Sequence, residues 1–537
     1  MHNHRTDTSF TVRKQYLMAM TPQLWKKVSI LHTISKCLTL TAVPVASLLY
    51  VLGGGYYSDT DYYWHIALGH RILQTGTFGG VDTLSWVAQQ QGLEYINHSW
   101  LADILLAWLA GLGSTEILGA VLYLTGSLAA LSVLVFALWG GGLLAPRRLA
   151  HRLADWAVVL AVWYCLRVTW GNPRPQQLAL VLFALALRLL QSAWHGGKNG
   201  WALPVLAALW ANVHGGSLPV LPSLTALYGL LALLPPFRVG QLCHRRGAPA
   251  RNWALLFMLE GLAGCLNPYG PGLYGQFLRV DTNSALLGVT EWQPVSWASS
   301  PAFFVALALL ILAWLLAHQP VPLAELLPLA ATTALALLHV RGVPWFAVCL
   351  AVFLLRHIEA LRHALAQLAD TAQHKRPAPN LLCRGLRAAF RAALPILTAG
   401  SLAACAWLAP RAVENQFYRL FPPELVNALH QIQPQKLYTS YNCGGMAIQA
   451  GFQSFVDSRA ELFTPQILTD AQIISGASRR SSTWSIDEVI ARYDFDAILL
   501  AKYDRELPAS YLALRSDWVM VYDGDWYTLF VTSQMVS

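Results

Sequence analysis

The sequence has few charged residues. Only 12% of its 537 residues are charged, whereas 55% are hydrophobic. Soluble globular domains usually carry a charged fraction of roughly 25%. The shortage of charge therefore argues against an ordinary soluble fold and predicts a chain whose solvent is lipid. Apolar stretches of about 17 to 25 residues, enough to cross about 30 Å of hydrocarbon, recur between residues 37 and 410 and then stop.

Paired cysteines are also missing. The eight cysteines are scattered and form no C-x-x-C pair, so we expect neither a zinc site nor a disulfide framework. The C-terminal part of the chain shows no Ser/His/Asp order, Gly-rich phosphate loop or metal-ligand cluster. Nor does the chain contain an internal repeat of the kind common in transporters.

Eleven apolar segments predict transmembrane helices. They are 37–53, 116–142, 154–171, 176–194, 201–214, 217–235, 254–268, 301–317, 322–339, 344–356 and 393–410. The first follows a basic N-terminus and has no small-residue cleavage site, so we expect it to be an uncleaved helix.

The net charge of +9 divides unevenly, with +13 up to residue 400 and −4 beyond it. The basic residues accompany the apolar segments, where they would set topology, so we expect no nucleic-acid partner. Because cytoplasmic loops are rich in Lys and Arg, residues 1–36 are predicted to be cytoplasmic. An odd number of spans then places 411–537 on the other side.

Together these patterns predict a polytopic α-helical protein of the bacterial cytoplasmic (inner) membrane, with a transmembrane domain at 37–410 surrounded by membrane lipids. Residues 54–115 would form its first outer loop, in which the amphipathic segment 98–113 lies along the membrane. Residues 411–537 would form a small extracytoplasmic α/β domain. Strands are expected at 436–439, 454–457 and 496–500, with a hairpin at 518–530.

The acidic pair Asp59 and Asp61, just after the first predicted span, is the first candidate site. Two carboxylates this close can share a divalent metal, or one can be held ionised by an arginine while the other acts as a base. The alternative is a capped helix start, with Asp59 as N-cap. A D-x-D pair by itself does not decide between these interpretations.

Arg174 and Arg341 are predicted on the same face as the aspartates. Guanidinium groups suit bidentate phosphate recognition, so two arginines beside carboxylates fit a lipid phosphate. The alternative for each arginine alone is a snorkelling residue at a helix end.

Other polar residues are predicted at this boundary and are candidates for substrate binding: His65, His98, Asn212, His214, Glu291 and Trp292. For His65 and His214 we prefer hydrogen-bonded histidines to metal ligands. Glu291 beside Trp292 is typical of a sugar site but also of an ordinary interfacial turn. In the tail, Asp457 and Arg459 form a site or, as we prefer, a structural ion pair.

These features resemble the GT-C class of polyprenyl-phosphate-sugar-dependent glycosyltransferases, and more closely a bacterial group of predicted membrane glycosyltransferases of largely unassigned activity. The resemblance rests on an acidic first outer loop, an amphipathic helix before the second span and an α/β tail. Its local motifs are Asp59–Gly69, Asn97–Leu101, Trp210–Gly216, Asn267–Gly270, Glu291–Pro294, Tyr441–Gly445 and Val456–Arg459.

The resemblance implies a membrane glycosyltransferase that moves a sugar, with inversion, from a polyprenyl-phosphate-linked donor to an extracytoplasmic lipid, glycan or protein acceptor. Asp61 is favoured as the general base, with Asp59 orienting it or binding metal. Arg174 and Arg341 would stabilise the leaving phosphate. Because some GT-C enzymes use a divalent cation and others do not, Mg²⁺ or Mn²⁺ held by Asp59 and Asp61 stays open.

We keep two other classes of function as alternatives. A transporter or flippase of an anionic lipid or sugar would use the same arginines and aspartates as a vestibule. A non-catalytic protein of envelope assembly would instead bind a partner through its tail.

Overall fold

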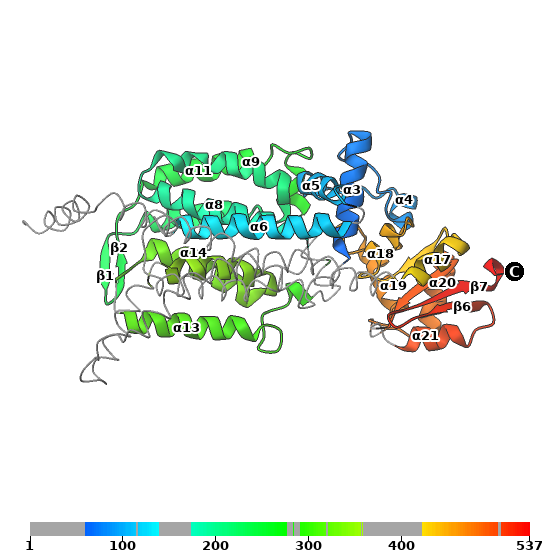
Figure 1. Ribbon diagram of the computed structural model, residues 1–537. Coiled ribbons are helices and arrows are strands. Elements are labelled where there is room, and N and C mark those ends of the chain that lie inside the picture. The colour runs from blue at the N-terminus through cyan, green and yellow to red at the C-terminus, as the bar shows by residue number, and fades with distance from the viewer. Residues whose placement is uncertain are drawn as a thin grey trace, which may run out of the picture.

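The computed structural model describes residues 60–113, 116–138, 173–276, 283, 290–317, 320–355, 357, 422–478, 480–502 and 506–536. Over these residues the chain forms a body of packed helices followed by a smaller α/β domain at the C-terminal end (Figure 1).

The body consists mainly of apolar helices, several of which run side by side in Figure 1. Their bounds are α3 (Asp61–Thr75), α4 (Trp86–Gln90), α5 (Trp100–Ala110), α6 (Glu116–Leu138), α8 (Gln176–Trp194), α9 (Leu203–His214), α10 (Val220–Leu231), α11 (Ala250–Ala263), α13 (Pro301–Ala317) and α14 (Leu323–Leu338). Short 3₁₀ turns are η1 (Lys198–Ala202), η2 (Gly215–Ser217), η3 (Thr290–Trp292) and η4 (Val340–Gly342), and a further helix covers 343–355. A small sheet of β1 (Phe237–Val239), β2 (Leu242–His244) and β3 (Val321–Pro322) lies at the end of the body away from the C-terminal domain.

Large aromatic side chains fill the core of the body. Trp210 and Phe183 are fully buried, and Trp345 stacks on Trp210 with ring centroids 6.0 Å apart. Phe183 meets Trp345 edge to face at 4.9 Å. Such rings bury a large apolar area each, which is the dominant favourable contribution to folding. This core joins α8, α9 and the 343–355 helix into one unit.

The prediction of eleven transmembrane helices is wrong. Among the described residues, one helix, α8, is both long and apolar enough to cross a membrane, and 67% of its most apolar stretch is buried inside the protein. Several other apolar segments form helices of only 10–17 residues, among them Val220–Leu231 and Leu323–Leu338. Apolar helices of that length are more typical of a packed core than of a membrane crossing. The predicted spans 37–53, 154–171 and 393–410, and part of 116–142, lie outside the described residues.

The predicted localisation is corrected with the span count. A multi-pass protein of the inner membrane would show many helices of spanning length, and the part of the chain that the structure describes shows one candidate. The cytoplasmic side assigned to residues 1–36 depended on the basic residues between the predicted spans, and the extracytoplasmic side assigned to 411–537 depended on an odd number of spans. Both assignments therefore lose their basis. The amphipathic segment 98–113 forms α5, but its Asp103 is completely buried rather than at a lipid interface.

The C-terminal domain is built on a four-stranded sheet in the order β4-β5-β7-β6. Its strands are β4 (Leu437–Thr439), β5 (Ala497–Ala501), β6 (Trp518–Asp523) and β7 (Tyr527–Thr532), with β4 and β5 parallel and the other pairs antiparallel. Its helices are α17 (Pro423–Ile432), α18 (Gly444–Gln449), α19 (Pro465–Ile474), α20 (Thr483–Tyr493) and α21 (Glu506–Ala513), followed by the 3₁₀ turn η5 (Ser533–Met535). The strand expected at 454–457 is absent: there, Ser454 makes one isolated bridge with Ser85.

The C-terminal domain packs against the start of the body. Helix α18 contacts α3, and Gly445 approaches the backbone of Thr60 so closely that a Cβ on it would lie 2.1 Å from the carbonyl oxygen. A larger residue at 445 would therefore force the two segments apart. The hydroxyl of Thr60 donates to the carbonyl of Asn442 at 2.8 Å. Residues almost four hundred positions apart in sequence are thereby brought to the first turn of α3.

Candidate functional site

A cavity of about 160 Å³ opens in the body near the C-terminal domain. Its polar lining includes two arginines, one carboxylate and two histidines: Arg174, Arg341, Glu291, His214 and His339. Its remaining wall is largely apolar and includes Leu180, Val220, Leu335, Pro344 and Trp345. A cavity with clustered positive charge and apolar walls suits a ligand that combines an anionic group with hydrocarbon.

Arg174 bridges two carboxylates at the edge of this cavity. Its guanidinium lies 3.0 Å from Asp61 and 3.2 Å from Glu291. The backbone positions it before the start of α8, where its amide donates to the side chain of Gln177 and its carbonyl accepts from Tyr123 at 2.8 Å. The prolines on either side of Arg174 restrict the local backbone, so the residue stands on a stiff segment.

Arg341 extends the cluster on the far side of Glu291. Its Nε lies 3.1 Å from the second oxygen of Glu291, and its guanidinium lies 4.9 Å from the centre of the Trp292 ring. Arg341 belongs to η4, where a Cβ on Gly342 would lie 2.3 Å from the backbone nitrogen of Ala336. Glycine is therefore required for η4 to pack against α14. The turn that carries Glu291 and the turn that carries Arg341 are thus held together by a charge pair and a cation–π contact.

The charges in this cluster are set by competition between burial and pairing. Burial alone would raise the pKa of Glu291, but Arg174 and Arg341 outweigh it and hold the pKa below its usual range. Burial lowers the pKa of Arg174, and Glu291 opposes that effect. Glu291 is therefore ionised at neutral pH, and it orients two cations toward one cavity.

Asp61 is a carboxylate whose pKa suits proton transfer near neutral pH. Burial raises its pKa to about 6, against the lowering effect of a hydrogen bond from Ser458 and the charge of His65. A carboxylate with a pKa near 6 is ionised at pH 7 yet accepts a proton more readily than an ordinary aspartate. The side chain begins α3 and is only 11% exposed.

His65, one turn further along α3, belongs to a buried polar network. Its Nδ1 lies 2.7 Å from a carboxylate oxygen of Asp103. Asn97 and Ser99 also donate to Asp103, which is completely buried. A carboxylate that accepts from Nδ1 fixes the orientation of the imidazole. The network ties α3 to α5 directly behind the base candidate.

The other predicted binding residues divide between two places. His214 lines the cavity and its ring lies 5.4 Å from that of His98, which in turn approaches Glu461 of the C-terminal domain at 3.6 Å. Burial lowers the pKa of both histidines, so both are neutral near pH 7. Asn212 lies apart: its side chain bonds Trp100 and the backbone of Ala208 and Leu266, so it has a structural role.

Asp59 lies outside the described residues, so its pairing with Asp61 stays a prediction. Within the described part of the chain, no three His, Cys, Asp or Glu side chains converge as metal ligands usually do. The possible Mg²⁺ or Mn²⁺ site at Asp59 and Asp61 is likewise a prediction.

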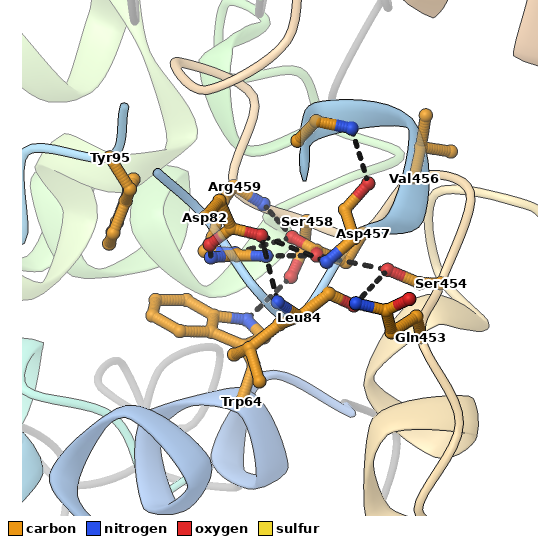
Figure 2. A network of polar contacts seen from close by, with 12 residues as sticks. Trp64, Asp82, Leu84, Tyr95, Gln453, Ser454, Val456, Asp457, Ser458 and Arg459 are labelled. Atoms are coloured by element: carbon orange, nitrogen blue, oxygen red, sulfur yellow. Dashed lines mark hydrogen bonds and ion pairs between the residues drawn. The ribbon is translucent and has the colours of Figure 1, made fainter. Parts of the chain in front are cut away.

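Sequence reasoning missed the residues that surround Asp61 from the C-terminal domain. Ser458 donates a hydrogen bond to Asp61, and the Trp64 indole donates to the same hydroxyl at 2.9 Å. Next to it, Arg459 is enclosed by Asp82 and Asp457 (Figure 2). The ion pair of Asp457 and Arg459 was expected, but its third member, Asp82, lies 377 positions away from Arg459 in the chain. Nothing in the sequence signals that partner.

Comparison with known proteins adds no identification. No protein-family model matches the chain, and no curated protein matches it. The site must therefore be interpreted from its own geometry.

Proposed function

We propose that the protein transfers a sugar from a polyprenyl-phosphate-linked donor to an acceptor, with Asp61 as the general base and Arg174 and Arg341 as the binding site for the phosphate. The observation that carries the proposal is the position of Arg174, which contacts Asp61 at 3.0 Å and also faces the cavity that holds Arg341. The proposed base, Asp61, is therefore adjacent to the proposed anion site formed by the two arginines.

The reaction would proceed as a single displacement. Asp61 takes the proton of the acceptor hydroxyl while the acceptor oxygen attacks the anomeric carbon of the donor. The bond between that carbon and the phosphate oxygen breaks, and its electron pair leaves with the phosphate. Attack opposite the leaving group inverts the anomeric configuration. The negative charge that develops on the phosphate is stabilised by oriented positive charge from Arg174 and Arg341.

Donor binding would also prepare the base. In the structure Asp61 and Glu291 both contact the guanidinium of Arg174. A phosphate that binds Arg174 competes with Asp61 for that guanidinium, and a carboxylate released from an arginine is a stronger base. The apolar part of the cavity wall, Leu180, Val220 and Leu335, would receive the first isoprene units of the donor.

Transfer can be measured directly. The purified full-length chain is mixed with a panel of polyprenyl-phosphate hexoses and pentoses in detergent micelles, and release of polyprenyl phosphate is followed with water or added glycans as acceptor. We expect Asp61→Asn to slow release at least about 100-fold, because a positioned general base contributes about 10²- to 10⁴-fold.

The matched control is Asp494→Asn, since Asp494 is 89% exposed on the C-terminal domain and pairs only with a surface lysine in the described structure. It should keep the wild-type rate. Wild-type activity in Asp61→Asn, or no release from any donor of the panel, would contradict the proposed function.

A further inference from the structure

The segment of the C-terminal domain that faces Asp61 is held in place by a completely buried ion cluster. Arg459 lies between Asp82, from the body, and Asp457, and all three side chains have no solvent exposure. Figure 2 shows the guanidinium between the two carboxylates, above the indole of Trp64. Arg459 also lies 5.1 Å from the centre of the Tyr95 ring. Because its carboxylate partners come from both parts of the molecule, Arg459 fixes the position of its neighbour Ser458 relative to α3.

Backbone contacts reinforce this attachment. The amide of Ser454 donates to the carbonyl of Leu84, and the amide of Trp86 donates to the carbonyl of Ser454. Ser85 donates through its hydroxyl to the carbonyl of Phe455 at 2.8 Å. Tyr441 donates to the carbonyl of Ser458 at 2.7 Å. Hydrogen bonds thus hold the chain just before Ser458, at Ser454 and Phe455, and also the carbonyl of Ser458 itself.

The direction of the Ser458 hydrogen bond is determined by its neighbours. The indole of Trp64 can only donate, so the Ser458 oxygen accepts that bond. A hydroxyl has one proton to donate. The ionised carboxylate of Asp61 has no proton, so it can only accept. Ser458 therefore donates its single proton to Asp61.

We propose that Ser458 is a positioning residue for Asp61, so that the C-terminal domain completes the active site by orienting the base. The inference rests on the proposed function, because it assigns Ser458 a role in the proton transfer that function requires. Ser458 holds one carboxylate oxygen while Arg174 contacts the other at 3.0 Å. When the donor phosphate competes for Arg174, the hydrogen bond from Ser458 continues to orient the carboxylate.

Removing the hydroxyl has a consequence that a purely structural role would not have. A hydrogen bond to an ionised carboxylate stabilises the ionised form, so its loss raises the pKa of Asp61 above its value of about 6. The other groups that act on Asp61 stay in place: Arg174, His65, Glu291, Asp457 and Tyr441. The pH below which transfer fails should then rise.

The experiment compares the pH dependence of kcat/KM in the full-length wild-type chain, Ser458→Ala and Ser458→Thr. The acid limb of this profile is the pH range in which the rate falls as Asp61 takes up a proton. We expect Ser458→Ala to move the acid limb upward by about one pH unit, because hydrogen bonds to charged groups are strong enough for a shift of that size. Ser458→Thr keeps the hydroxyl and should restore the wild-type limb. Ser475→Ala is the control: Ser475 is a buried serine of the same domain whose hydroxyl donates to the carbonyl of Gln472. It should leave the limb unchanged.

A second measurement needs no substrate. The Asp61 carboxyl can be titrated by isotope-edited infrared spectroscopy, using Asp61→Asn to assign its band, in wild type and Ser458→Ala. A higher midpoint in Ser458→Ala supports the inference. An unchanged midpoint and an unchanged acid limb, with Asp61→Asn inactive, would overturn the role of Ser458 and leave the proposed function standing. Full activity in Asp61→Asn would instead overturn the proposed function itself.

Discussion

Two arginine–carboxylate clusters lie on either side of Asp61, and they differ in how their charges are used. In the first, which we call the sealed cluster, Arg459 lies with Asp82 and Asp457, and every side chain is at 0% exposure. In the second, the cavity cluster, Arg174, Arg341 and Glu291 line a cavity, and their side chains are 16%, 32% and 29% exposed. The first cluster has no surface left for a ligand, whereas the second presents its cations to an open volume.

The difference separates a structural from a ligand-binding use of the same side chains. Burial would disfavour the charge on Arg459, but Asp457 and Asp82 raise its pKa well above the usual value, so it is permanently charged and fully satisfied. In the cavity cluster, one carboxylate is shared between two arginines. Arg174 also contacts Asp61, but unlike Arg459 both arginines face an open volume, where an anionic ligand can reach a guanidinium group. Arg459 therefore attaches the domain, whereas the position of Arg174 and Arg341 at the cavity supports the phosphate binding proposed for them.

The largest effect is expected from Arg459→Ala. The substitution leaves Asp82 and Asp457 buried without their cation, and breaking a buried pair in this way costs about 3–5 kcal/mol. Denaturant unfolding of the full chain measures the loss. If Arg459→Ala lowered the free energy of unfolding by less than about 1 kcal/mol, the sealed cluster would not be the structural attachment described above.

Arg341→Ala should have the opposite profile, with weaker ligand binding and little change in stability. Loss of one charged contact to phosphate corresponds to about 1–3 kcal/mol, or a roughly ten- to hundred-fold higher Kd for polyprenyl phosphate. Because Arg341 is partly exposed, the free energy of unfolding should change by less than about 1 kcal/mol. Unchanged binding together with a large loss of stability would make the two clusters equivalent and remove the distinction between them.

The pH dependence of wild-type transfer sharpens the assignment of Asp61. The proposed base, Asp61, would act in its ionised form, and burial raises its pKa to about 6. The rate should therefore be constant above that pH and fall about tenfold per unit below it, so that at pH 5 roughly a tenth remains. A pH–rate profile of kcat/KM measures the limb. A limb near pH 4 would indicate an unperturbed carboxylate and contradict the role of burial.

The smallest effect is expected at a charge pair outside both clusters. Lys436 pairs with Asp494 at 3.0 Å, but the lysine is 36% and the aspartate 89% exposed. Exposed pairs contribute little because solvent screens them, so Lys436→Ala should change the free energy of unfolding by about 0.5 kcal/mol or less. A loss comparable to that of Arg459→Ala would show that burial is not what distinguishes the sealed cluster.

The sequence was informative about where helices lie and misleading about what surrounds them. The segments 176–194, 301–317 and 322–339 are helical as α8, α13 and α14. Apolar composition cannot distinguish lipid from protein as the neighbour of such a helix. Helices of 12 residues such as α9 and α10 bury one apolar face against other helices, although Val205, Leu209 and Leu230 are exposed. Such packing is a tertiary fact that no window of sequence contains.

The candidate site was anticipated unevenly. Asp61, Arg174, Glu291 and Arg341 were selected because a membrane topology placed them on one face. That topology is wrong for the described residues, yet the structure joins the four side chains through three ion pairs. Their chemical type explains why they are nevertheless together, since arginines and carboxylates are few in this chain and attract one another. Ser458 could not be found in this way, because a single serine has no pattern and its position depends on the docking of the C-terminal domain.

The most direct test of the account is a structure of the full chain with polyprenyl phosphate bound. We predict that the phosphate lies in the cavity with its oxygens about 3 Å from the guanidinium nitrogens of both Arg174 and Arg341, beside Asp61. The isoprene chain should then follow the apolar wall at Leu180 and Val220. A phosphate bound elsewhere, with Arg174 still paired to Asp61 and Glu291, would contradict the central claim that this cluster is the donor site.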